Sequence, residues 1–163
     1  MKIEHLEERI TDYKNSIEAV VDKKTFWISE LKNLILSTLT TIVTRYDIGW
    51  KVQELNWIYT NEAVNITFHS FPNELIDCTN RIPKYQFIPG GSLVFSQTYN
   101  GDIFVFILYP YNDSGNAQKD MLEIGTFGPK DISEKFIVEK VDEFLKEIIR
   151  WELPNQKSKV GYS

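Results

Sequence analysis

The chain has 163 residues, of which 42% are hydrophobic and 13% aromatic, and this is enough to bury one core of ordinary domain size. The net charge of −5 provides no basic field of the kind that neutralises phosphates, so binding to nucleic acid is disfavoured. The sequence has one cysteine, Cys78, and shows neither the pattern of a secretory signal nor an apolar stretch long enough to span a bilayer. We therefore expect a cytoplasmic protein without a membrane segment. It should form a single domain over residues 1–154, with an N-terminal helical arm (about 1–25) and a flexible polar tail over 155–163.

The first 48 residues contain neither glycine nor proline, which favours one long helix, continuous or only kinked, over a tight helical hairpin. Near the N-terminus, apolar residues recur at alternating spacings of three and four, which is the a/d pattern of a helix that packs lengthwise on another helix. From Phe26 onward the apolar stripe widens, which is typical of burial in a globular core. The residues of this seam are Ile3, Leu6, Ile10, Tyr13, Ile17 and Val20.

The charges that flank the seam show how well a second copy of the helix would pack in parallel. In that pairing Lys2 meets Glu7 favourably, whereas Arg9 meets Lys14 with like charge. The parallel homodimer is therefore not optimised for charge. An antiparallel pairing, the helix of a partner protein and the chain's own C-terminal helix stay open as alternatives.

After Gly49 the apolar period changes to two. Leu55, Trp57 and Tyr59 alternate with polar residues, and Val64, Ile66 and Phe68 do so again, which predicts two antiparallel strands. Asn65, Thr67 and His69 should share the opposite face of the second strand. The loop that follows is rich in turn formers and could hold a short helical turn around residues 74–78.

Asn100-Gly101 lies between two apolar runs and predicts a hairpin with a two-residue type I′ turn. That turn would set Tyr99 opposite Asp102 and Phe95 opposite Phe106. Residues 103–109 are apolar on both faces, which predicts a central strand covered on each side.

A further strand is predicted over residues 121–126. Asp131 and Glu134 then resemble a capping box at the start of a helix that ends near Leu153-Pro154. The predicted class is thus α+β: a long N-terminal helix or helical hairpin, an antiparallel sheet of about five strands, and a C-terminal helix packed on the sheet. Because the sheet has many apolar positions, we expect it to be sandwiched between the two helical elements; an exposed docking face is the alternative.

Residues that could carry chemistry are few. We find no catalytic signature and no set of residues at metal-ligand spacing, so we expect neither a metal nor a cofactor. His69 and Cys78 are interpreted as a strand histidine and an inert loop cysteine. If a ligand binds, we expect it at loops beside the sheet ends. The residues considered for ligand binding are His69, Gly90, Gly91, Tyr109, Tyr111 and Asn112.

The sequence favours a non-enzymatic protein-interaction module of the adaptor, regulator or inhibitor type. It would self-associate or bind another protein through the seam of its N-terminal helix. The alternative is a small-molecule-binding domain or an enzyme without a sequence signature, whose pocket lies between helix and sheet.

Overall fold

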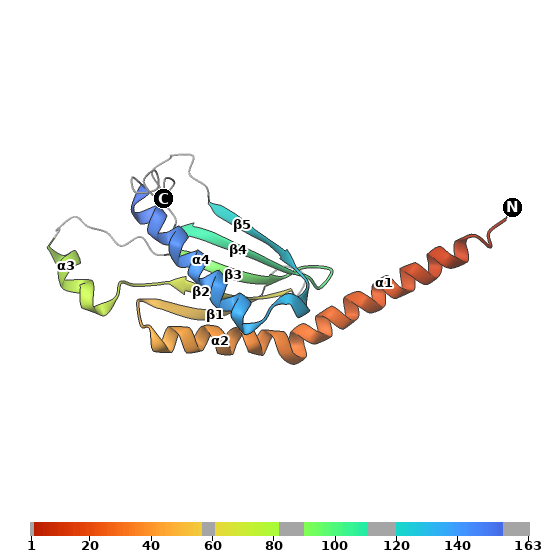
Figure 1. The fold of residues 1–163 in the computed structure, drawn as a ribbon, viewed down its shortest axis with the longest axis horizontal. Helices are drawn as coiled ribbons and strands as arrows, with labels where there is room; N and C mark the ends of the chain where they lie inside the picture. The colour runs from red at the N-terminus through yellow and green to blue at the C-terminus, as the bar shows by residue number, and fades with distance from the viewer. Residues whose placement is uncertain (1, 57–60, 82–89, 111–119, 155–163) are drawn as a thin grey trace.

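The computed structural model describes residues 2–56, 61–81, 90–110 and 120–154. One continuous helix forms the N-terminal part of the chain. α1 (Leu6–Phe26) continues through a π-helical turn (Trp27–Leu31) into α2 (Lys32–Arg45). The backbone stays in the right-handed helical region at both joints, so the prediction of one helix rather than a hairpin is confirmed. α2 then lies along the sheet, while α1 extends beyond it (Figure 1).

Five antiparallel strands form one sheet in the order β1-β2-β3-β4-β5. This confirms the predicted α+β class, and the strand that contains residues 103–109 is an interior strand with β3 on one side and β5 on the other. β4 lies next to an edge because only β5 follows it. The strands are β1 (Trp50–Asn56), β2 (Glu62–Phe68), β3 (Gly90–Gln97), β4 (Ile103–Pro110) and β5 (Met121–Phe127). The first strand begins earlier than predicted, and Trp57 and Tyr59 lie outside the described residues.

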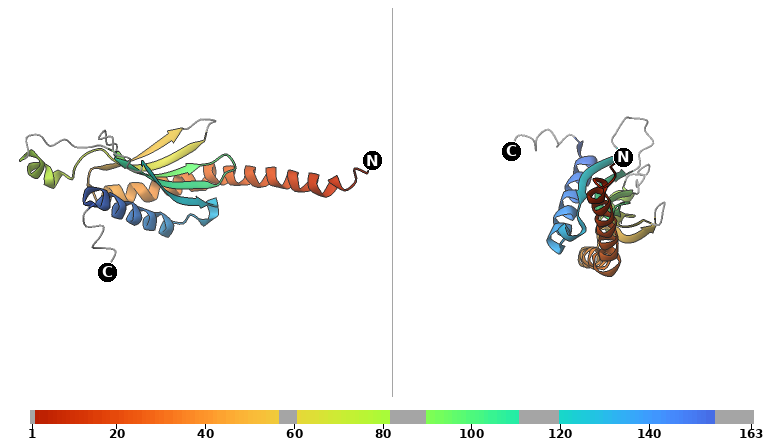
Figure 2. Two further views of the ribbon diagram at one scale, coloured as in Figure 1. Left: turned by 90° about the horizontal axis from the view of Figure 1, so that it is seen from above. Right: turned by 90° about the vertical axis from the view of Figure 1, so that its right-hand side faces the viewer.

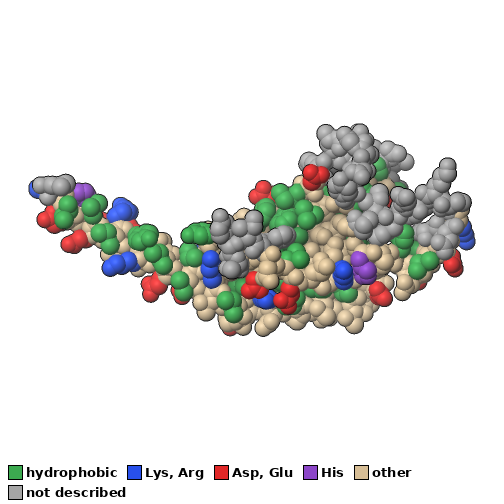
Figure 3. Space-filling view, turned by 180° about the vertical axis from the view of Figure 1, so that it is seen from behind, with side chains coloured by type: hydrophobic (Ala, Val, Ile, Leu, Met, Phe, Trp, Pro, Cys, Tyr) green, Lys and Arg blue, Asp and Glu red, His purple; other side chains and the backbone are tan. Residues whose placement is uncertain are grey.

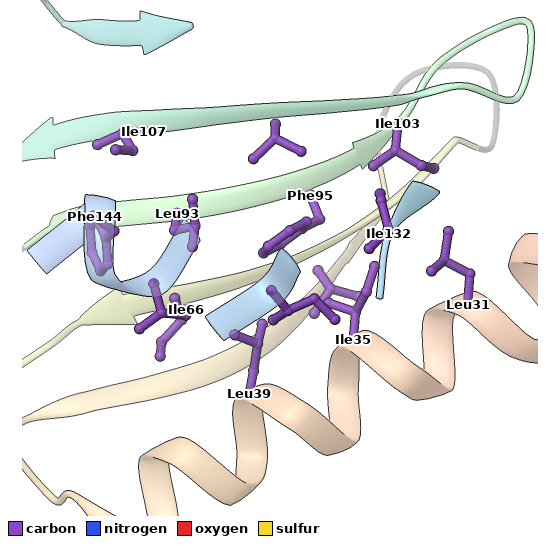
Figure 4. Packing of buried hydrophobic residues seen from close by; sticks show 14 of the residues in the cluster. Leu31, Ile35, Leu39, Ile66, Leu93, Phe95, Ile103, Ile107, Ile132 and Phe144 are labelled. Carbon is purple, nitrogen blue, oxygen red and sulfur yellow. The ribbon is translucent and has the colours of Figure 1, made fainter. Parts of the chain in front are cut away.

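Both long helices cover the same face of the sheet, so the expected sandwich is wrong and the described helices and strands form two layers (Figure 2). α2 packs on β1 and β2, whereas α4 (Glu134–Glu152) packs on β3 and β4 and also contacts α2. Their apolar faces meet one set of strand residues, and Leu31, Ile35 and Phe95 in this layer have no exposed surface (Figure 4). On the other face, Asn65, Ser92 and Ser96 are buried polar residues, and no described helix lies over them.

The hairpin between β3 and β4 has a longer turn than predicted. The amide of Thr98 donates to the carbonyl of Asp102 at 2.9 Å, and the amide of Gly101 donates to the carbonyl of Thr98 at 3.0 Å. Three residues therefore lie between the last paired residues, and Gly101 has a φ of +90°. This is the pattern of a type I turn followed by a glycine bulge. We call Thr98–Asp102 the hairpin turn.

The extra residue shifts the register of β3 on β4 by one. Phe95 pairs with Val105 rather than Phe106, and Tyr99 does not oppose Asp102. Because side chains alternate between faces, the shift decides which β4 residues oppose the core-facing residues of β3. In the structure Leu93 and Phe95 meet Ile107 and Val105 in the core.

The start of α4 differs from the prediction, whereas the predicted helical turn after β2 is present. Ser133, not Asp131, is the N-cap of α4, because its hydroxyl accepts a hydrogen bond from the amide of Phe136 at 3.1 Å. Asp131 lies in the preceding 3-10 turn (Pro129–Asp131), so the predicted capping box is wrong by two residues. The predicted helical turn in the loop after β2 is present as a 3-10 turn (Asn73–Leu75) and α3 (Ile76–Asn80).

Candidate functional site

The N-terminal residues and the first turns of α1 are exposed and form a surface separate from the domain core. Residues 2–19, which we call the exposed arm, are all exposed, and no residue of α1 is buried. Five of the six seam residues predicted from the sequence lie on α1, and Ile3 lies just before it; all six are exposed except Val20, which is half-buried. Figure 3 shows hydrophobic side chains along the arm between charged ones. The exposed fractions are 60% for Ile3, 45% for Leu6, 51% for Ile10, 65% for Tyr13 and 47% for Ile17.

The same stripe becomes the core of the domain further along the helix. Trp27 and Leu31 continue the a/d spacing of the seam, and both have no exposed surface. The seam therefore changes from an open surface to a packed interface within two turns after Val20. Sequence reasoning missed Val21, which is 55% exposed and widens the open part of the stripe.

The hairpin turn is the feature at which the open seam ends. A Cβ placed on Gly101 would lie 2.6 Å from the Cβ of Lys23, so the turn rests directly on the helix. The ammonium of Lys23 is 2.8 Å from the carboxylate of Asp102, and the ammonium of Lys24 lies 5.3 Å from the centre of the Tyr99 ring. No local pattern could have revealed these contacts, because they join residues far apart in the chain.

A hollow of about 540 Å³ lies beside this joint, between the base of α1 and the turn that precedes α4. Asp22 and Lys23 line it from the helix, and Lys130 and Asp131 line it from the turn. The two acids and the two lysines balance each other, so the hollow has no charge excess that would select an anion or a cation. We assign no chemistry to it.

The structure brings most of the residues considered for ligand binding to the other end of the sheet, away from the arm (Figure 1). Gly90 pairs with Pro110 of β4, beside Tyr109, and the register of β2 on β3 brings His69 towards Gly90. His69 is exposed, and its amide donates to the carbonyl of Gly49 at 2.8 Å. Tyr111 and Asn112 lie outside the described residues.

Two of these residues are engaged by α4. The hydroxyl of Tyr109 donates to the carboxylate of Glu147 at 2.9 Å, and the Cδ1 atom of Ile148 is 3.0 Å from the position that a Cβ on Gly91 would take. Burial, followed by this hydrogen bond, raises the pKa of Tyr109 to about 12. Tyr109 is thus a protonated donor at neutral pH, and its contact fixes the end of β4 to α4.

Among the described residues, no group of three or more His, Cys, Asp or Glu side chains could hold a metal ion. Within the same ranges, no helix has both the length and the apolar character needed to span a bilayer. No protein-family model, curated protein or solved structure matches the chain. The exposed arm is an apolar surface of the described residues that a partner could cover.

Proposed function

We propose that this protein is a non-enzymatic protein-interaction module, of the adaptor, regulator or inhibitor type, which binds another helix through the seam of its exposed arm. One observation carries the proposal: four seam residues on α1, which extends beyond the sheet, and Ile3 just before it are 45% to 65% exposed (Figure 1). The proposal includes self-association and the binding of a different protein.

The exposed arm lacks the packing that usually stabilises a helix in a protein. Most helical stability in proteins comes from the packing of an apolar face rather than from helix propensity. The exposed arm has an apolar face, and every residue from 2 to 19 is exposed. Binding a second helix along the seam would remove that face from water, which is worth about 25 cal/mol for each Å² of apolar surface.

The chain's own C-terminal helix is not free to fill the seam. α4 buries Ile137, Val141 and Phe144 against the sheet, so its apolar face is already occupied. A helix from a second molecule is the remaining source among the alternatives that the sequence leaves open.

The alternative of a ligand pocket between helix and sheet has no comparable support. Ile35, Leu93 and Phe95 fill that interface and have no exposed surface.

Photo-crosslinking in the cells that produce the protein tests the proposal. A photoreactive residue replaces Ile10 or Ile17 in the seam, and the matched controls carry it at Glu8 or Asn15 on the opposite face of the same helix. We expect defined protein adducts from the seam positions and at most weak adducts from the controls. Addition of Ile10→Asp should abolish the adducts formed from position 17.

Two results would contradict the proposal. One is a yield of adducts from the seam no higher than from the control positions. The other is an adduct pattern that Ile10→Asp leaves unchanged, because a charge in the centre of the seam should prevent helix packing. The mass of the adduct also separates a second copy of the chain from a different protein.

A further inference from the structure

We propose that the helix bound by the exposed arm is the exposed arm of a second copy of this chain, packed antiparallel with Ile3 opposite Val20. This inference rests on the proposed function and deepens it by naming the occupant, its direction and its register. It is carried by the position of the hairpin turn and by the charges that flank the seam.

The hairpin turn limits how far two arms can overlap. It contacts the helix from Val20 onward, because a Cβ on Gly101 would lie 3.4 Å from the carbonyl oxygen of Val20 and 2.6 Å from the Cβ of Lys23. The tip of an approaching antiparallel helix therefore has to stop at Val20. In the longest register that fits, each tip reaches Val20 of the other copy, and an a residue faces a d residue in every layer. The layers within α1 are Leu6 with Ile17 and Ile10 with Tyr13, and Ile3, just before the helix, lies beside Val20 at each end. Each contact occurs twice because the pair is symmetric.

The flanking charges favour this register. In an antiparallel pair, e residues face e residues and g residues face g residues across the seam. Glu7 then lies beside Lys14 of the second copy, and symmetry repeats this attractive pair. On the other side of the seam Arg9 faces Ser16, which carries no charge. Near the ends Lys2 approaches Lys23, whose charge is already matched by Asp102 at 2.8 Å.

A register one heptad shorter is opposed by charge. It would set Glu7 against Glu7 and Arg9 against Arg9 of the second copy, and like charges destabilise a pairing. It would also leave the outer parts of both seams in water. Length and charge therefore disfavour it together.

A register one heptad longer is opposed by the domain itself. It would bring Leu6 against Lys24, which lies under the Tyr99 ring, and Ile3 against Trp27, which has no exposed surface. It would also set Lys14 against Lys14 of the second copy. The hairpin turn occupies the space that this overlap needs.

A parallel pair fits less well than the antiparallel one. It sets Arg9 against Lys14 of the second copy, twice by symmetry, and this repulsion offsets the two favourable contacts between Lys2 and Glu7. It also brings the two hairpin turns to the same level along the helix pair, beside the seam that both helices share. The antiparallel pair instead places the two domains at opposite ends.

Disulfide trapping in the full chain tests both direction and register. Cys78→Ser removes the exposed native thiol, and Ile3→Cys and Val20→Cys are then made as separate variants. In the proposed pair, residue 3 of one copy lies beside residue 20 of the other, whereas the two copies of residue 3 are about 25 Å apart at 1.5 Å per residue. We expect a mixture of the two variants to give linked heterodimers, and Ile3→Cys alone to give no linked species.

A charge variant provides an independent measurement that does not depend on thiols. Lys14→Glu should weaken the antiparallel dimer about tenfold at low salt, because two attractive pairs become repulsive. In a parallel dimer the same change would relieve the contact with Arg9 and strengthen association. Adding Glu7→Lys should bring the dissociation constant back toward the original value, as measured by light scattering over a concentration series.

Each outcome decides between the alternatives. Linked dimers of Ile3→Cys alone, or tighter association of Lys14→Glu, would overturn the antiparallel register. A monomer at all concentrations without trapped dimers would exclude the second copy as occupant. In that case photo-crosslinking of the seam to a different protein would leave the proposed function standing, and its absence would remove the proposed function as well.

Discussion

At the scale of single residues, both the backbone conformation and the packing at position 101 require glycine. Its φ of +90° is a conformation that residues with a side chain rarely adopt, and a Cβ there would meet the Cβ of Lys23 at 2.6 Å. We expect Gly101→Ala to lower the free energy of unfolding by roughly 1–3 kcal/mol, as measured by urea denaturation. Gly128→Ala is the matched control: its φ is −65°, and a Cβ there meets only the flexible carboxylate of Asp131 at 3.1 Å. Equal losses in the two variants would show that the contact between turn and helix does not matter.

Tyr109 gives a prediction for the dependence of stability on pH. Burial and the hydrogen bond to Glu147 raise the pKa of Tyr109 from 10.0 to about 12 in the folded protein. The folded state therefore holds this proton more tightly, and the resulting stability is complete below pH 10 and is lost as the pH rises to about 12. Because other groups titrate in the same range, we compare the chain with Tyr109→Phe. The difference between their free energies of unfolding should shrink from pH 9 to pH 12, and a constant difference would contradict the assignment.

The sequence predicts the hairpin between β3 and β4 but not the length of its turn or the register of the two strands. Asn100-Gly101 correctly indicates a hairpin, but the pair fits either a two-residue turn or a three-residue turn with a glycine bulge. Alternation of apolar and polar residues would normally choose the register, and here it does not, because Val94 and Phe106 are apolar on the face away from the helices. The choice depends on how the turn meets Lys23, and that contact is made only in the folded chain.

At the scale of elements, the seam was predictable because it depends on helical period alone. The spacing from Ile3 to Val20 identifies one face of a helix whatever the rest of the chain does. The point at which this face becomes buried was not predictable, because the hairpin turn and the sheet decide it. The π-helical turn at Trp27–Leu31 leaves no comparable signal, although it lies where the exposed stripe passes into the core.

At the scale of the whole molecule, the α+β class followed from the order of the elements, whereas the layering did not. Apolar content suggested that both faces of the sheet needed a helix, yet α2 and α4 lie side by side on one face (Figure 2). The useful signal was the polar character of the second face, where Asn65, Ser92 and Ser96 are 5%, 7% and 9% exposed. Polar residues at alternate positions of the central strands fit poorly against the apolar stripe of a helix.

The shape of the assembly gives a prediction for the whole molecule. If the arms pair antiparallel from Ile3 to Val20, the helix pair is about 27 Å long and carries one domain at each end. Small-angle X-ray scattering above the dissociation constant should then give a distance distribution with two maxima, one within domains and one between them. Ile10→Asp with Ile17→Asp should remove the second maximum and leave the first, because the domain core begins at Trp27. A dimer with a single maximum would place the domains side by side, which the position of the hairpin turn opposes and which would require the arms to run parallel.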